Sequence, residues 1–283
     1  MITVFSNNQE VQVNRLQFSD GALTFKLEDM PKGARYISIK VCPTTPVYFI
    51  REELLLITEC IWELVQEDHF GRNVPMYLEL PYLPYARADR KFEHGNPVPL
   101  HSFLNTLDHI NGFDEIYICD IHNKSAVEGF NLNIIEKTQL ECFKASLPQD
   151  FDTKYDLVLA PDKGSVEKAK SIANHLEIPV YNCGKERDAS TGKILRSTLP
   201  DGVDFTGKTV LIPDDLCDGG YTFIKLAEQV KAVGAEQVDL YVTHLIASKG
   251  LDVFEGLVDN VYCHHTVGNY VNKLDVTHFN NSK

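Results

Sequence analysis

The sequence predicts an α/β fold with mostly parallel sheets, and three observations support this prediction. Apolar runs of strand length recur along the chain, each separated from the next by helical or loop-rich sequence. Segment 51–69 places Leu54, Ile57, Ile61 and Leu64 at helical spacing, which predicts a helix with one buried face. The 283 residues are 43% apolar, which is enough for a large core. The predicted strands are 36–41, 74–80, 115–121, 156–160, 209–212 and 238–245.

A polar segment, 146–155, separates two groups of predicted strands and predicts a domain boundary. We therefore expect two domains, residues 1–147 and 148–283. Ligands of open α/β sheets bind beyond the carboxyl ends of the strands. Residues that directly follow predicted strands are thus the first candidates for a site.

The net charge of -13 excludes some classes of protein. So acidic a chain repels a nucleic-acid backbone, and we expect no nucleic-acid partner but a small anion held by local basic residues. The seven cysteines are scattered without zinc spacing, which is typical of reduced thiols in the cytoplasm. No signal sequence opens the chain and its apolar patterns are short, so we expect a soluble cytoplasmic protein without a membrane partner.

Segment 210–223, VLIPDDLCDGGYTF, is the most informative part of the sequence. A predicted strand leads into Asp214 and Asp215, and a glycine turn at 218–220 precedes a helical pattern from Phe223. Glycines let backbone N–H groups approach a phosphate, and the start of a helix adds a favourable dipole. The two carboxylates can accept hydrogen bonds from ribose hydroxyls or hold magnesium. The alternative is an ordinary strand-to-helix turn with Asp218 as the N-cap.

This segment resembles the phosphoribosyl-diphosphate loop of phosphoribosyltransferases and ribose-phosphate diphosphokinases. Further segments resemble motifs of the diphosphokinases, the phosphoribosyl pyrophosphate synthetases, in the order of that family. The resemblance implies two tandem phosphoribosyltransferase-like domains, each with a mostly parallel sheet flanked by helices. The N-terminal domain would carry the ATP-binding loop, and the C-terminal domain the ribose-phosphate loop and a catalytic lid. The further segments are PYARADRK at 84–91, CDIHN at 119–123, APDKG at 160–164 and GKER at 184–187.

The resemblance assigns ATP to two loops. Segment 18–22, FSDGA, resembles a hairpin that reaches adenine from a neighbouring subunit in this family, so we expect a homo-oligomer. Arg87 and Arg90 can bind the phosphates or stack on adenine. The candidate ATP-binding residues are Phe18, Asp20, Arg87, Asp89 and Arg90.

The transferring phosphates, their metal ion and the sugar are assigned to different residues. Lys185 and Arg187 lie in a polar segment, 184–193, which we interpret as a mobile lid with two catalytic cations. His122 and Asp162 each follow a predicted strand and are the candidate ligands of Mg²⁺. Ribose and its phosphate are assigned to Asp214, Asp215, Asp218, Gly219, Gly220, Tyr221 and Thr222.

Two positions depart from the family loop, which usually reads D-T-x-G-T. Gly219 lacks the hydroxyl of a threonine, and Tyr221 stands where the family has a glycine. Tyr221 can point outward, or it can face a larger substrate and stack on a base or bond to a second phosphate.

The predicted reaction is magnesium-dependent transfer of the β,γ-diphosphoryl group of ATP to the anomeric hydroxyl of ribose 5-phosphate, with release of AMP. Because of Tyr221, a second candidate acceptor is ADP-ribose, which would connect the enzyme with nicotinamide and NAD salvage. A phosphoribosyltransferase and a catalytically silent homologue that regulates a partner are two further possibilities. The arginines of 84–91 and the pair Lys185 and Arg187 favour the diphosphokinase.

Overall fold

The computed structural model of the chain divides into two compact units, Met1–Lys137 and Thr138–Lys283, and we describe each by itself. The division precedes helix α3 (Gln139–Ser146), whereas we expected a boundary at 147/148. Helix α3 falls in the second unit because it packs against a helix and strands there. The described residues are 1–28, 33–67, 74–110, 112–146, 155–187 and 194–268, with only the backbone described at 66–67, 185–187 and 194–197.

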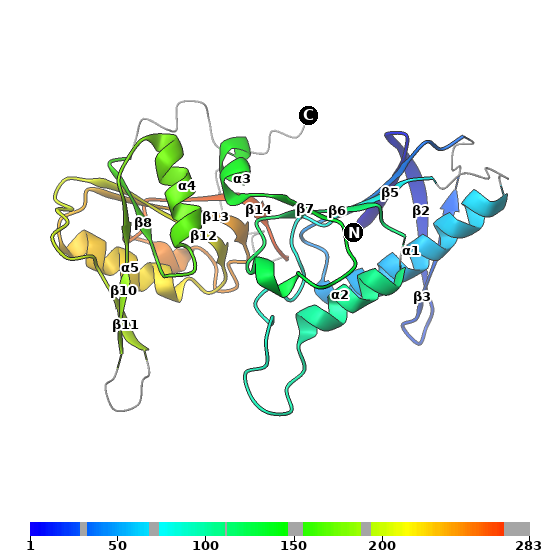
Figure 1. Cartoon of the computed structure of the whole chain (residues 1–283), viewed down its shortest axis with the longest axis horizontal. Coiled ribbons are helices and arrows are strands. Elements are labelled where there is room, and N and C mark those ends of the chain that lie inside the picture. Colours follow the sequence, from blue (N-terminus) through cyan, green and yellow to red (C-terminus); the bar gives the residue numbers. More distant parts are fainter. Residues whose placement is uncertain (29–32, 68–73, 111, 147–154, 188–193, 269–283) are drawn as a thin grey trace. The chain divides into compact units, whose positions relative to one another are not determined.

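The first unit contains a seven-stranded mixed sheet with the strand order β3-β2-β1-β4-β5-β6-β7. Neighbouring strands from β3 to β4 in this order are antiparallel, and those from β4 to β7 are parallel. Helices α1 and α2 lie along this sheet in Figure 1. The elements are β1 (Ile2–Ser6), β2 (Gln9–Gln17), β3 (Leu23–Glu28), β4 (Ile37–Val41), α1 (Val47–Glu67), β5 (Met76–Glu79), α2 (Pro99–Ile110), β6 (Glu115–Cys119), the 3-10 helix η1 (Lys124–Ala126) and β7 (Ile134–Lys137).

Helix α1 confirms the helical spacing seen in the sequence. Leu54, Ile57 and Ile61 are buried in the core of the first unit, and Leu64 packs against the same core. The helix begins before the predicted position, directly after Pro46, because proline is well tolerated at a helix start.

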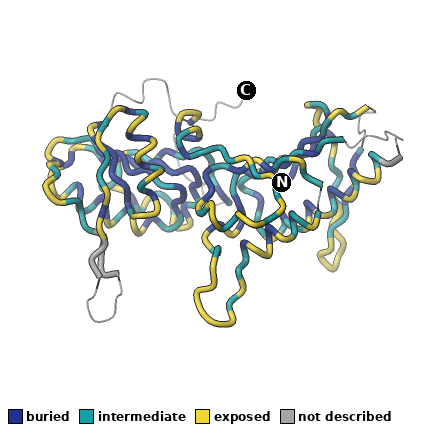
Figure 2. The backbone as a smooth tube through the Cα atoms, viewed as in Figure 1, coloured by how far each residue is buried: buried dark blue, intermediate teal, exposed yellow. Residues whose placement is uncertain are grey.

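The second unit contains a five-stranded parallel sheet with the order β14-β13-β12-β8-β9. Helices α3 and α4 cover one face, over a core that includes Phe143, Ile172 and Tyr241. Helix α5 covers the other face with Leu226 and Val230. The strands between these layers are mostly buried (Figure 2), as expected of a parallel sheet. The elements after α3 are β8 (Leu157–Ala160), α4 (Val166–Leu176), β9 (Val180–Asn182), β10 (Gly184–Arg187), β11 (Ile194–Thr198), β12 (Thr209–Cys217), α5 (Tyr221–Ala232), β13 (Gln237–Leu245), the 3-10 helix η3 (Asp252–Phe254) and β14 (Asn260–Thr266).

Strands β10 and β11 form a separate antiparallel ribbon that projects from the second unit (Figure 1). The sequence predicted a polar lid at 184–193. In the structure, the described part of that segment is strand β10. Residues 188–193 and the side chains of Lys185 and Arg187 lie outside the described part of the chain.

Asp239 connects several elements at the amino ends of the strands in the second unit. Its fully buried carboxylate accepts hydrogen bonds from the hydroxyl of Tyr155 at 2.6 Å and the amide of Asn260 at 2.9 Å. The amide of Gln237 donates to both carboxylate oxygens. Burial, followed by the charge of Asp239, raises the pKa of Tyr155, so the phenol stays protonated and keeps donating. These bonds stabilise the edge of the sheet opposite the carboxyl ends.

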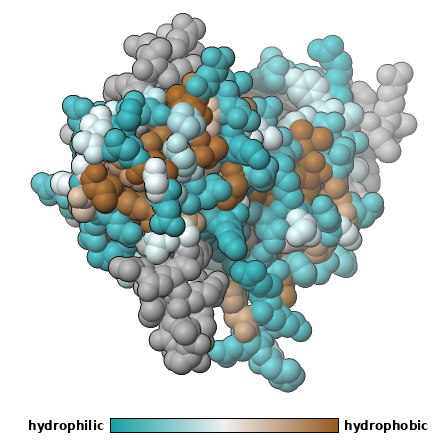
Figure 3. All heavy atoms as spheres, turned by 60° about the vertical axis from the view of Figure 1, so that its left-hand side comes forward, coloured by the Kyte–Doolittle hydropathy of each residue, from teal (hydrophilic) through white to brown (hydrophobic). Residues whose placement is uncertain are grey.

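The surface in Figure 3 is mostly hydrophilic, with hydrophobic side chains gathered in patches. Two large exposed side chains come from the predicted site residues, because Phe18 is 52% and Tyr221 is 71% exposed. No helix among the described residues is long and apolar enough to cross a membrane.

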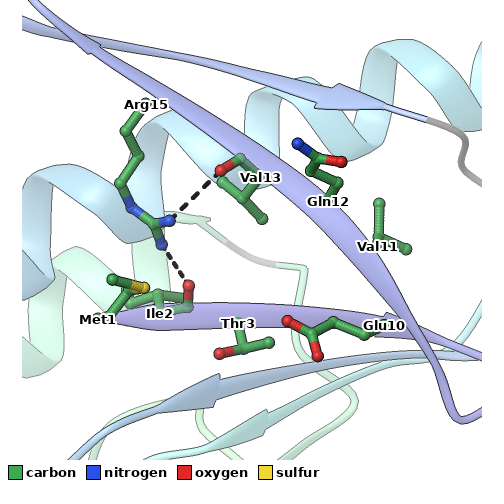
Figure 4. Close-up of a pocket in the computed structure, with 8 residues that line it drawn as sticks. All are labelled: Met1, Ile2, Thr3, Glu10, Val11, Gln12, Val13 and Arg15. Atoms are coloured by element: carbon green, nitrogen blue, oxygen red, sulfur yellow. Dashed lines mark hydrogen bonds between the residues drawn. The ribbon is translucent and has the colours of Figure 1, made fainter.

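A pocket of about 370 Å³ lies between β1 and β2 in the first unit (Figure 4). The paired register of the two strands begins at Val4 and Val11, and beyond these residues the guanidinium of Arg15 bridges the gap by donating to the carbonyls of Ile2 and Val13. Ile2, which lines the pocket, pairs with Val41, so the pocket lies beside the carboxyl end of β4.

Candidate active site

Strand β12 carries the acid pair that the sequence singled out. The predicted strand ended at 212, but β12 continues to Cys217, so Asp214 and Asp215 lie on the strand itself. Parallel pairing with β13 extends over this part, with Asp214 opposite Val242. The backbone of the acid pair is therefore fixed by the sheet.

Asp215 forms an ion pair with a lysine that the sequence analysis missed. Its Oδ2 lies 3.6 Å from Nζ of Lys168 on α4, and the side chains are 9% and 21% exposed. Lys168 adjoins the buried face of α4, which includes Ala169 and Ile172. In the sequence, the position of this lysine beside an apolar helical stripe was the feature that could have indicated that its side chain lies against the sheet.

Burial raises the pKa of Asp214 well above its usual value, and the nearby charge of Asp215 raises it further. The backbone N–H of Asp215 donates to Oδ1 of Asp214 at 2.9 Å and opposes this shift. The charged form of Asp214 is thus disfavoured, and when this acid is protonated it can donate a hydrogen bond. A protonated acid beside a carboxylate offers a donor and an acceptor to neighbouring hydroxyls.

Asp162 follows β8 and forms the turn that starts α4. Its Oδ1 accepts hydrogen bonds from the backbone N–H groups of Gly164 at 2.8 Å and Ser165 at 3.2 Å. The charge of Asp162 reaches Asp214, whose pKa it helps to raise. The structure therefore brings Asp162 and the acid pair to the same edge of the sheet.

In the glycine turn after β12, the backbone of Gly220 lies close to the ring of Phe254. Gly220 has a φ of +74°, and a Cβ at this position would lie 2.6 Å from the ring of Phe254. Gly220 is the N-cap of α5, which begins at Tyr221, so the interpretation with Asp218 as the N-cap is wrong. Asp218 instead accepts a hydrogen bond from the hydroxyl of Ser248, which holds the turn against the segment after β13.

Gly219 leaves space that the side chain of Lys249 occupies. A Cβ at Gly219 would meet Cε of Lys249 at 3.4 Å, so the lysine stem lies over the glycine. Ser248 and Lys249 follow a predicted strand, and their position was the signal by which the sequence could have identified them. Lys249 brings a positive charge to the turn, and Tyr221 at the start of α5 is exposed.

The first unit holds a second group of predicted residues. The amide of Asn123, in the segment that follows β6, donates to Oδ2 of Asp89 at 2.6 Å. This bond brings the ATP-type loop to the strand end that also carries His122. Arg90 lies 3.8 Å from Asp89, and its side chain is 76% exposed. Arg87 and His122 are also exposed, so these side chains can reach a ligand in solution.

Phe18 and Asp20 lie in the turn of the β2–β3 hairpin, as the sequence predicted. Asp20 Oδ1 accepts a hydrogen bond from the backbone N–H of Ala22 at 3.0 Å, and Gly21 adopts a φ of +93°. The hairpin turn is built by these local bonds. They leave the ring of Phe18 half exposed.

Known proteins resemble this chain along most of its length. A family model described as a phosphoribosyl transferase domain matches residues 138–260. A ribose-phosphate pyrophosphokinase of Pyrococcus furiosus is 28% identical over 261 residues, which are 89% of this chain and 88% of that protein. A protein of the same name from Sulfurisphaera tokodaii is 29% identical over 237 residues, covering 83% of this chain and 76% of the relative. The chain is a homologue of the ribose-phosphate pyrophosphokinases.

A solved structure shows that this pyrophosphokinase homologue shares the fold as well. The phosphoribosylpyrophosphate synthetase of Mycobacterium smegmatis matches with a TM-score of 0.71 at 20% identity, over 89% of this chain and 79% of that one. The predicted α/β fold is thus confirmed, and the sequence relatives confirm the predicted resemblance to the ribose-phosphate pyrophosphokinases. The part of this chain that the family model matches contains Asp162, Lys168, Asp214, Asp215, the turn at 218–222, Ser248 and Lys249.

Proposed function

We propose that this protein transfers the β,γ-diphosphoryl group of ATP to the anomeric hydroxyl of ribose 5-phosphate and releases AMP. The observation that carries the proposal is the acid pair of β12 beside the glycine turn at 218–220, within a chain related to ribose-phosphate pyrophosphokinases. This arrangement supplies acceptors for ribose hydroxyls next to backbone N–H groups for a phosphate.

The acid pair would bind the ribose hydroxyls, and the turn would bind the 5-phosphate. Asp215 accepts a hydrogen bond from one ribose hydroxyl, and the protonated Asp214 donates to another. Backbone N–H groups at the start of α5 and the hydroxyl of Thr222 bind the 5-phosphate. The sugar is then oriented for in-line attack of its 1-hydroxyl on the β-phosphorus, with AMP as the leaving group.

The residues on the ATP side neutralise charge. Arg87 and Arg90 are exposed cations next to Asp89 and can bind phosphates, while Phe18 offers a ring and Asp20 an acceptor for adenine. Lys185 and Arg187 on β10 would stabilise the charge that develops on the transferring group. If Phe18 and Asp20 serve a neighbouring subunit, the protein forms a homo-oligomer, and its mass in solution tests this.

The donor set fits magnesium through Asp162. Mg²⁺ binds through one or two carboxylates, waters and substrate phosphates, and the carboxylate of Asp162 is held in place by two backbone N–H groups. His122 offers a nitrogen, which Mg²⁺ takes less readily than oxygen. When bound, the ion neutralises charge on the phosphates of ATP. EDTA should abolish AMP release and added Mg²⁺ should restore it, whereas release that continues in EDTA would contradict this cofactor.

ADP-ribose is the second candidate acceptor, and the surroundings of Gly219 favour it. Tyr221 is 71% exposed at the start of α5, and Lys249 lies over Gly219. An aromatic ring and a lysine next to a phosphate site can stack on a base and bind a second phosphate. Such an acceptor would give ADP-ribose 1-diphosphate, a product suited to NAD salvage.

The test measures AMP release from Mg-ATP with ribose 5-phosphate and with ADP-ribose in separate reactions, and product mass identifies the acceptor. We expect turnover with at least one sugar and little with Asp215→Asn. Turnover with ADP-ribose that falls selectively in Tyr221→Gly would establish the second candidate. No AMP with either sugar would contradict the proposed reaction and favour a silent homologue, and AMP-free transfer from phosphoribosyl diphosphate to a base would favour a phosphoribosyltransferase.

A further inference from the structure

Lys168 is a cation from a helix that lies at the edge of the proposed sugar site. Its Nζ is 3.6 Å from Oδ2 of Asp215, and both side chains are mostly shielded from solvent. Removing two charged groups from water is costly, so a shielded ion pair is weak as a source of stability. Its position next to the acid pair suggests a role in binding instead.

The carboxylates around Lys168 repel one another. Asp214, Asp215 and Asp162 are close enough that the charges of the last two raise the pKa of Asp214, while Lys168 lowers it. Without a cation, repulsion from Asp214 and Asp162 would favour other rotamers of the Asp215 side chain. The backbone of Asp215 is fixed by β12, so the rotation of its side chain is the freedom that an ion pair can restrict.

Helix α4 holds Lys168 firmly. Asp162 accepts hydrogen bonds from the backbone at the start of the helix, and Ala169 and Ile172 are fully buried next to the lysine. The root of the lysine side chain therefore has a fixed position relative to β12, against which α4 packs.

We propose that Lys168 is a positioning residue for the sugar: its ammonium group holds the Asp215 carboxylate in the orientation in which that carboxylate accepts a hydrogen bond from a ribose hydroxyl. The inference rests on the proposed function, because it takes ribose as the ligand of Asp215. Lys168 itself need not touch the sugar. Its loss should weaken binding of the acceptor more than it slows the chemical step.

The experiment compares Lys168→Met with Lys168→Arg, which keeps the charge. Lys170→Met is the matched control, since Lys170 lies on the same helix, is 56% exposed and pairs only loosely with Glu167 at 3.9 Å. Calorimetry measures the binding of ribose 5-phosphate and of ADP-ribose, and AMP release gives KM and kcat. Thermal melting checks the fold, and Lys168→Gln replaces the methionine variant if that variant unfolds.

We expect Lys168→Met to weaken acceptor binding and raise the acceptor KM by about 10- to 100-fold, as for the loss of a charge-assisted hydrogen bond. The kcat and the KM for ATP should change much less, Lys168→Arg should restore most of the affinity, and Lys170→Met should behave as wild type. Folded Lys168→Met with wild-type affinity and acceptor KM would overturn the role of Lys168 alone. Wild-type protein that binds the sugar without releasing AMP would overturn the proposed reaction alone, and wild-type protein that does neither would overturn both.

Discussion

Asp214 and Asp239 are two acidic residues of the same sheet whose surroundings differ. Asp239 accepts hydrogen bonds from Tyr155, Gln237 and Asn260, which together satisfy its carboxylate. Asp214 accepts a backbone hydrogen bond from Asp215 but faces that residue's charge, and its pKa is raised. A carboxylate whose oxygens all accept hydrogen bonds contributes to the stability of the fold. A carboxylic acid whose charged form is disfavoured by its surroundings is typical of a functional site.

Replacement of Asp214 by asparagine should stabilise the protein above the usual pKa of an aspartate. A raised pKa in the folded state means that the folded protein holds a proton which the unfolded chain releases. Stability is therefore lost as the pH rises from the unfolded pKa through the folded pKa. Melting temperatures of both proteins from about pH 4 to about pH 8 check this.

We expect Asp214→Asn to melt higher than wild type at neutral pH and to approach it at acidic pH, with less AMP release throughout. A difference in melting temperature that does not depend on pH would contradict the raised pKa of Asp214.

Strand β12 and the turn after it show where prediction from the sequence succeeded and where it ended. The apolar run at 209–212 predicted the strand, and the glycines predicted the turn. The sequence did not predict the extension to Cys217, because polar residues continue a strand only where a neighbour pairs with them, here β13. The sequence also did not predict the roles of Lys168 and Ser248, because their contacts with Asp215 and Asp218 join segments that are distant in the chain.

The two glycines of the turn should differ in their tolerance of alanine. At Gly220 a methyl group would meet Phe254 in a left-handed backbone conformation, whereas at Gly219 it would touch only the flexible stem of Lys249. Gly220→Ala should lower the free energy of unfolding by about 1–3 kcal/mol. Gly219→Ala should change it by less than about 0.5 kcal/mol. Urea unfolding of the two variants measures this, and equal losses would contradict the geometry of the turn.

Asp239 should stabilise the opposite edge of the same sheet. In Asp239→Asn the new amide would present N–H groups where Gln237 and Asn260 already donate, so we expect a loss of about 1.5–3 kcal/mol in the free energy of unfolding. Tyr155→Phe removes one of the donors and should cost about 1 kcal/mol. Urea denaturation provides both values. A smaller loss for Asp239→Asn than for Tyr155→Phe would contradict the assignment.

At the scale of the whole molecule, the predicted site residues fall into two groups, one in each unit. Arg87, Asp89 and Arg90 belong to the first unit with His122. Asp162 and the acid pair belong to the second. The motifs were found from the sequence because each is a short local segment. The division at 137/138 was not, because the polar stretch at 146–155 gave a stronger local signal than the packing of α3.

This division predicts that substitutions in the two units affect different substrates. Arg90→Ala should raise the KM for ATP by about tenfold, as expected for the loss of a charged contact to phosphate, and leave the KM for the sugar nearly unchanged. Asp215→Asn should raise the KM for the sugar instead. Steady-state AMP release with each substrate varied in turn measures the four constants. A sugar KM that rises as much as the ATP KM in Arg90→Ala would contradict separate binding roles.

The continuation of β12 through the acid pair has a consequence for how such a protein changes over evolutionary time. The carboxylates sit on a paired strand, so their geometry tolerates little variation, while the turn and helix start next to them carry Gly219, Tyr221 and the neighbouring Lys249. Under the proposed function, mutations in this short stretch would change which group on the far end of the sugar is accepted, without moving the carboxylates at the reacting end. A few substitutions would then suffice for a new acceptor, while the reaction stays the same.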